Sequence, residues 1–324
     1  MLKKLLPLLV SFALLATLVY FSDVGKIYAT IARVNLYLLL LTIGMWFVSH
    51  LIKVARWRFL LAKNSVNVRF WEAFKVFTAS GFFSNITPAK AGEPLKSFIL
   101  KKSTGANVGE TMPAIFFERV FDIISLIAVS LVSMLFLTRT VTKIQYLLGL
   151  SIAAYIVLIA AAVFILVSKK RTTALASRLY RMFSFLPKVK DFNGRVGEFV
   201  DSFHKSFVTY KSKWLYFVVF CMSVSIWVIE GSILFTIFYA LGFSVTLASA
   251  MFIIPVATLV SVITLLPGGI GSSEIVIVVF FSSLFGLTFA DVTSVALVTR
   301  VSTFWSSTIL GAAIFSRIKY KFKL

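Results

Sequence analysis

The 324-residue chain is 59% hydrophobic, contains 34 phenylalanines and carries a formal net charge of +21. Its mean hydropathy of +0.96 excludes an ordinary soluble protein. Uncharged runs of about twenty residues recur along it, which is the length that a membrane-spanning helix needs. The sequence therefore predicts an all-α polytopic membrane protein.

Lysine and arginine are concentrated in three blocks. Residues 53–102 hold ten of them against two acids, residues 169–213 hold eleven against three, and the last eight residues hold four against none. Because cytoplasmic loops are enriched in Lys and Arg, we expect these blocks and both termini to face the cytoplasm, at the cytoplasmic membrane. Anionic lipid headgroups then account for the positive charge, and no nucleic-acid partner is expected.

Residues 1–167 form the first half of the predicted fold. Residues 5–21 are too long an apolar run for a signal peptide and predict a retained span, and residues 36–52 return to the cytoplasmic side. The second span leads into a basic, aromatic segment typical of an interfacial anchor, with Lys53, Arg56, Trp57, Arg58 and Lys63. Two further spans are predicted at residues 112–137 and 146–167.

A basic linker and a second half follow. Residues 168–213 place apolar side chains at helical spacing between charges, which predicts amphipathic helices on the inner leaflet. Residues 214–324 contain spans at 214–240 and 291–315. Residues 70–97 and 249–285 are interrupted, so they predict two broken hairpins, either re-entrant or fully crossing. We thus expect one integral membrane domain, residues 1–324, with about six full spans and two broken hairpins.

The two interruptions share one pattern. Each places a proline, a glycine and a glutamate ahead of an arginine that lies inside an apolar span: Pro88, Gly92, Glu93 and Arg119 in the first half, and Pro267, Gly271, Glu274 and Arg300 in the second. The interval from glutamate to arginine is 26 residues in both. By the charge pattern, the Arg119 span runs outward and the Arg300 span runs inward. The halves are therefore predicted to be inverted repeats, as in transporters whose site lies between the repeats.

Proline and glycine at membrane depth free backbone polar groups, which is tolerated only where protein or a water-filled cavity satisfies them. The second break also contains Gly268 and Gly269. A helix that begins after such a break directs N–H groups and the positive end of its dipole toward the cavity, where an anion can bind.

Charged residues near the breaks are candidates for binding the headgroup phosphate of a lipid. Arg119 and Arg300 supply bidentate donors that suit phosphate, and Lys90, Glu93 and Glu274 at the breaks are further candidates for the same headgroup site. An alternative is that a Glu–Arg pair in each half only stabilises the fold. Glu230, deep in the span at 214–240, is a candidate proton or amine partner.

Metal and cofactor chemistry has little support in the sequence. Cys221 is the single cysteine, and His50 and His204 are far apart and lack the spacing of metal ligands. We therefore expect no intramolecular disulfide, no metal site and no cofactor.

At "ARWRFLLA", "NITPAKAGEP", "FERVFD", "LLPGGIGSSE" and "ALVTRVSTFW" the sequence resembles the lysylphosphatidylglycerol synthase transmembrane family, also called flippase-like integral membrane proteins. The resemblance covers most of the chain. It implies the lipid-translocating half of the bacterial multiple peptide resistance factor, which carries aminoacylated phosphatidylglycerol to the outer leaflet. Related stand-alone members are associated with lipid-linked sugars. The aminoacyl-transferase domain of that factor has no counterpart here, so we expect no synthesis of lysylphosphatidylglycerol.

The residues and the resemblance together predict a transporter rather than an enzyme. We expect it to move an anionic lipid, such as an aminoacylated phospholipid or a polyprenyl-phosphate-linked sugar, across the cytoplasmic membrane by alternating access around a central phosphate-binding cleft. The alternative is a membrane enzyme or accessory subunit in lipid-linked glycan transfer. Whether the protein forms a homo-oligomer is left open by the sequence.

Overall fold

A computed structural model of the protein describes residues 2–87, 90, 92–137, 168–183, 196–264 and 266–322, and the single positions 153, 157, 160 and 164. Every regular element in these residues is helical. The first half and the linker contain α1 (Leu2–Phe21), α2 (Val24–Ala32), α3 (Leu36–Lys63), α4 (Phe70–Ile86), α5 (Leu95–Thr104), α6 (Val108–Leu135), α8 (Lys169–Phe183) and α10 (Val196–Thr209). The second half contains α11 (Lys213–Ala240), α12 (Leu247–Ile263), η3 (Pro267–Gly269), α13 (Ser272–Phe285), α14 (Phe289–Arg300), η4 (Val301–Trp305) and α15 (Ser306–Phe322).

Several of these helices are long and apolar enough to cross a membrane. By length and composition, three described helical segments qualify, at Leu36–Lys63, Lys213–Ala240 and Pro267–Phe285. A fourth arises if the bent pair α1–α2 counts as one span. The chain is therefore a multi-pass helical membrane protein. Apart from positions 153, 157, 160 and 164, the span predicted at 146–167 lies outside the described residues, and so does Pro88 of the first break.

Polar residues at helix starts explain where several helices begin. The Asn35 side chain accepts hydrogen bonds from the backbone N–H groups of Tyr37 and Leu38, at 3.0 and 3.2 Å, at the start of α3. Asn107 caps α6 in the same way through Gly109 N–H, at 2.9 Å. Such caps satisfy donors that have no partner within the helix. They set the helix starts more sharply than hydropathy does.

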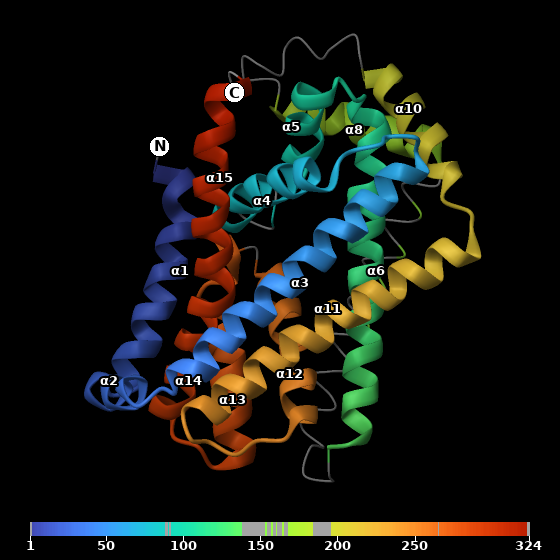
Figure 1. The fold of residues 1–324 in the computed structure, drawn as a ribbon. Coiled ribbons are helices and arrows are strands. Elements are labelled where there is room, and N and C mark those ends of the chain that lie inside the picture. The colour runs from blue at the N-terminus through green and yellow to red at the C-terminus, as the bar shows by residue number, and fades with distance from the viewer. Residues whose placement is uncertain are drawn as a thin grey trace.

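The centre of the molecule is an antiparallel pair of long helices (Figure 1). Helices α3 and α11 run side by side in opposite directions and pack against each other. The two chain termini lie at one end of the bundle, together with α5, α8 and α10. Helix α6 runs away from that end, whereas α14, η4 and α15 run toward it. The helices that carry Arg119 and Arg300 are therefore antiparallel.

The two broken hairpins lie toward opposite ends of the bundle. The α4–α5 hairpin lies on the side of the termini, and the α12–α13 hairpin lies on the other side (Figure 1). Their tips meet: a β-carbon on Gly268, in η3, would lie 3.1 Å from the backbone oxygen of Asn85, near the end of α4. The two sequence breaks are thus neighbours in space although they are far apart in the chain.

Two parts of the structure were not predicted from the sequence: the short helix α2 and the π-helical turn η4. Between the spans predicted at 5–21 and 36–52 the chain forms helix α2, which bends from α1 by 87° and packs on α14. The Lys26 ammonium donates to Thr288 at 2.8 Å and pairs with Asp291 at 3.5 Å. The last predicted span contains η4, a π-helical turn that joins α14 to α15, and its Ser302 hydroxyl lies 2.8 Å from the Thr42 hydroxyl of α3.

We expect Gly311→Ala to lower the melting temperature of the detergent-solubilised protein. A β-carbon at Gly311, in α15, would lie 2.7 Å from the carbonyl oxygen of Thr78 and 2.9 Å from Cβ of Phe82, so α15 and α4 would have to separate. Overpacking of this kind costs about 1–3 kcal/mol. Fluorescence-detected size-exclusion chromatography after heating would measure the change.

Gly44→Ala is the matched control, because no atom lies within 4 Å of a β-carbon at that exposed position of α3. Alanine is the better helix former, so this variant should keep or raise the melting temperature. Equal stability of the two variants would contradict the close approach of α4 to α15.

Candidate functional site

Two adjoining cavities lie where the hairpin tips meet. Their volumes are about 260 and about 340 Å³. The smaller one is lined by the second break and Arg300, and the larger one by Glu93 and Arg119. They share lining side chains from α3, α4, the first break and α11, namely Trp46, Lys53, Asn85, Lys90, Trp227 and Glu230. We refer to these two adjoining cavities as the paired cavity.

At the second break, Arg300 holds the chain through every part of its guanidinium group. It pairs with Glu274 through Nε and, at 3.2 Å, through Nη2. Nη1 and Nη2 also donate to the carbonyl oxygens of Gly268 and Gly269, both at 2.9 Å, and Nη2 contacts Ser273. Backbone carbonyls freed by the break are therefore satisfied by the arginine, as membrane depth requires.

The glycines of the second break have backbone conformations that other residues adopt with strain. Gly268, Gly269 and Gly271 all have positive φ angles, between 60° and 87°. The N–H of Gly271 donates to the Glu274 carboxylate at 2.9 Å. The sequence predicts that the helix starting here presents free N–H groups to an anion. The Glu274 carboxylate already accepts from the Gly271 N–H, so the protein supplies an anion of its own at this helix start.

At the first break, the equivalent pair shares its arginine with another acid. Arg119 Nε lies 3.0 Å from Glu93, and Nη2 lies 3.0 Å from Asp122. The turn is closed by Gly92, whose N–H donates to the Thr87 hydroxyl at 2.8 Å. A β-carbon on Gly92 would lie 2.5 Å from the backbone of Phe83, so only glycine fits there.

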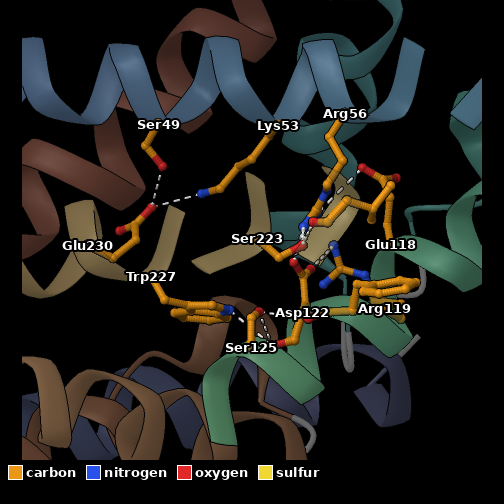
Figure 2. A network of polar contacts seen from close by, with 12 residues as sticks. Ser49, Lys53, Arg56, Glu118, Arg119, Asp122, Ser125, Ser223, Trp227 and Glu230 are labelled. Carbon is orange, nitrogen blue, oxygen red and sulfur yellow. Dashed lines mark hydrogen bonds and ion pairs between the residues drawn. The ribbon is translucent and has the colours of Figure 1, made fainter. Parts of the chain in front are cut away.

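A buried ion-pair network continues from Asp122 into α3 and α5 (Figure 2). Arg56 donates to Asp122 at 2.5 Å and lies 3.6 Å from Glu118, which accepts a hydrogen bond from Lys96 at 2.6 Å. The Arg56 side chain is only 1% exposed. A charge so deeply buried must be paired, because an isolated one would cost several kcal/mol. Glu118, near the centre of this network, is thus a structural residue.

Two contacts tie α11 to this network. Arg56 also donates to the Ser223 hydroxyl of α11 at 2.5 Å, and the Trp227 indole N–H donates to the backbone oxygen of Asp122 at 3.0 Å. About one helical turn before Arg56 in α3, Lys53 pairs with Glu230 at 2.8 Å (Figure 2). Polar contacts therefore join the two halves across the paired cavity.

Lys90 differs from the other cations that line the paired cavity. It lies between the two breaks, lines both cavities and is exposed. Its φ angle of 57° is in the left-handed region, uncommon for a residue with a β-carbon. No hydrogen bond or ion pair joins it to any described residue. Nearby, the Ser84 hydroxyl lines the larger cavity, is 6% exposed as a residue and has no hydrogen-bond partner among the described atoms.

The structure shows where the predicted site residues lie, while their binding of a headgroup stays a prediction. The structure brings Lys90, Glu93, Arg119, Glu230, Glu274 and Arg300 to one pair of cavities. The interfacial-anchor interpretation of Arg56 and Trp57 is wrong, since both side chains are buried. Among the described residues, no group of three or more His, Cys, Asp or Glu side chains is placed to hold a metal ion.

Lys53, Arg56 and Lys96 are site residues that sequence reasoning missed. Ser49, Lys53 and Arg56 are spaced four and three residues apart, so they form one polar stripe along α3. Polar residues along one side of a helix indicate contact with protein, whereas an interfacial anchor has them all around the helix end. The spacing of these three residues in the sequence could therefore have identified them.

We expect Glu274→Gln to lower the melting temperature more than Glu93→Gln does. The Glu274 side chain is 2% exposed and, within the described residues, is the one carboxylate paired with Arg300, whose side chain is 18% exposed. Its loss leaves a largely buried charge without a counter-ion, which costs up to about 3–5 kcal/mol. Arg119 is 39% exposed and keeps Asp122 when Glu93 is neutralised. Melting curves of both variants in one detergent would rank them, and a larger loss in Glu93→Gln would contradict this assignment.

Comparison with known proteins places the chain. The sequence model described as the lysylphosphatidylglycerol synthase TM region matches residues 5–311, which include both breaks and both arginines. A UPF0104 membrane protein of Pyrococcus horikoshii is 26% identical over 326 residues, with 96% of each chain covered. One of Methanothermobacter thermautotrophicus is 28% identical, with 81% of this chain and 77% of the relative covered. Since the match covers nearly its whole length, this membrane protein belongs to the lysylphosphatidylglycerol synthase transmembrane family.

Proposed function

We propose that the protein translocates an anionic lipid across the membrane, with the headgroup passing through the paired cavity. The observation that carries the proposal is Lys90, a cation without a carboxylate partner among the described residues, at the meeting point of two breaks. An uncompensated charge at membrane depth is costly, and such residues usually mark a pathway for a substrate or ion. A lipid phosphate would supply the missing counter-charge.

The lining of the paired cavity fits a headgroup better than a wholly polar solute. Lysine, serine and asparagine side chains lie beside apolar ones such as Ile123, Leu126, Ile254 and Val262. A phosphate and its polar substituents would contact the first group. The acyl or prenyl chains would stay in the surrounding lipid, so only the headgroup would need a polar path.

The arrangement of the two halves supports alternating access. The α4–α5 and α12–α13 hairpins lie toward opposite ends, and the helices that carry Arg119 and Arg300 are antiparallel (Figure 1). These are features of inverted repeats with broken helices around a central site. In this proposal each hairpin opens the paired cavity toward one side of the cytoplasmic membrane.

The charged residues then divide into two groups. Arg300 and Glu274 hold the second break, since the Arg300 donors are already engaged there. Lys90 and the more exposed Arg119 contact the phosphate. Glu230, paired with Lys53 at 2.8 Å on the wall shared by both cavities, is placed to meet a proton or a headgroup amine.

The function is tested in proteoliposomes that contain acyl-labelled fluorescent phosphatidylglycerol. Dithionite quenches label in the outer leaflet only, so translocation appears as additional quenching with time. We expect faster translocation than in protein-free vesicles made in parallel. Equal rates in both preparations for phosphatidylglycerol and for a polyprenyl-phosphate-linked sugar would refute the proposal.

We expect Lys90→Gln to slow this translocation about tenfold, because a contact between a charged donor and phosphate contributes about 1.5–3 kcal/mol. The matched control is Lys75→Gln, which removes the same charge from an exposed position of α4 that does not line the paired cavity. The control should keep the wild-type rate. If both variants translocate as fast as wild type, Lys90 does not contact the headgroup.

A further inference from the structure

The charges around the paired cavity do not cancel. Within the part of the chain that the structure describes, six cationic side chains line it: Lys53, Arg56, Lys90, Lys96, Arg119 and Arg300. Five carboxylates face them, four in the lining and one, Glu118, behind it as the partner of Arg56 and Lys96: Glu93, Asp122, Glu230, Glu274 and Glu118. The buried His50 is stacked on Trp46 and counted as neutral. One positive charge is therefore left over.

The ion pairs show where the surplus charge resides. Lys53 pairs with Glu230, Arg300 with Glu274, and Lys96 with Glu118. Arg56 and Arg119 share Asp122, and Arg119 also has Glu93. No ion pair or hydrogen bond joins Lys90 to a described residue, although Glu93 and Asp122 lie near enough to attract its ammonium group. Lys90 is thus the cation that is left over once the ion pairs are assigned.

A second negative charge would find no free cation. It could bind only by drawing a cation away from its carboxylate, which would leave that carboxylate unpaired in a poorly solvated cavity. A zwitterionic headgroup would bring a cation together with its phosphate, and since Glu230 is already paired with Lys53, the net charge of the cavity would stay at plus one. A headgroup with one negative charge neutralises the surplus and breaks no existing ion pair. The Ser84 hydroxyl, which has no hydrogen-bond partner among the described atoms, offers a neutral donor to a second phosphate oxygen.

We infer that the paired cavity selects headgroups with a single net negative charge, such as a phosphodiester monoanion, over pyrophosphates, phosphomonoesters and zwitterions. The inference rests on the proposed function, whose substrate class it narrows. The selectivity then follows from the net charge of the cavity lining. Lys90 makes this net charge plus one, and Glu230, by pairing with Lys53, keeps it from being plus two.

The test compares initial translocation rates of four acyl-labelled lipids in the same vesicles: phosphatidylcholine, phosphatidylglycerol, phosphatidylinositol and phosphatidylinositol 4-phosphate. The first has no net charge, the next two have one negative charge, and the last has about three. In wild type we expect phosphatidylglycerol and phosphatidylinositol to move at least about tenfold faster than the other two. Phosphatidylinositol and its 4-phosphate differ by one phosphate group, which makes them a matched pair.

Two variants shift the balance in opposite directions. Lys90→Gln makes the cavity neutral, so the rate ratio of phosphatidylglycerol to phosphatidylcholine should fall about tenfold. Glu230→Gln frees Lys53, so the rate ratio of phosphatidylinositol 4-phosphate to phosphatidylinositol should rise. Lys75→Gln should leave both ratios unchanged. Because each ratio is measured within one variant, it does not depend on how much of the protein folds.

The outcomes separate the two proposals. If wild type moves no lipid faster than empty vesicles do, the proposed function and this inference both fail. If wild type moves lipids with rates that ignore headgroup charge, or if the ratios stay fixed in both variants, the inference fails and the function stands. Uptake of radiolabelled glycerophosphoglycerol, a soluble phosphodiester, at the rate of phosphatidylglycerol would show that the cavity accepts the free headgroup, and would overturn selection of a lipid.

Discussion

A charged side chain at membrane depth requires a partner, and this requirement organises the fold around its two breaks. Each break frees backbone groups and carries a glutamate. In each, that glutamate pairs with an arginine that lies 26 residues later in the chain. Without Arg300, the carbonyl of Gly268 would have no donor among the described residues, and the carbonyl of Gly269 would keep only the hydroxyls of Ser272 and Ser273. The ion pairs thus permit non-helical backbone inside the bundle, and the paired cavity follows from that backbone.

The two pairs are chemically alike but differently connected. All the hydrogen bonds that the Arg300 guanidinium donates go to residues of its own break. Arg119 shares Asp122 with Arg56, and Arg56 reaches α11 through Ser223. The ion pairs of the first break therefore extend to the antiparallel pair of α3 and α11, whereas the second break contacts its neighbours by close packing, as at Asn85 of α4. Such an asymmetry suits a pair of gates that do not open together.

The sequence predicted the helical class, the two breaks and the convergence of the charged residues near them. The matched interval between glutamate and arginine also indicated the ion pairs, as the structural alternative to phosphate binding. It did not separate Lys90 from the arginines, because pairing depends on contacts between helices distant in the chain. Arg56 was misassigned for a related reason: charge density locates the cytoplasmic side but does not say how deep a side chain lies. Helix α2 was missed because it is only nine residues long, and a helix so short is rarely stable without the tertiary packing that the sequence does not show.

The π-helical turn η4 has a consequence for the comparison of related sequences. It adds one residue to the turn that separates Arg300, which faces the second break, from Gly311, which faces α4. One residue corresponds to a rotation of about 100° in an α-helix. A relative lacking that residue would have to close the turn into a regular one, and its α15 would present a different side to α4. A one-residue gap at 301–305 in an alignment would therefore mark a relative whose first hairpin packs on different side chains.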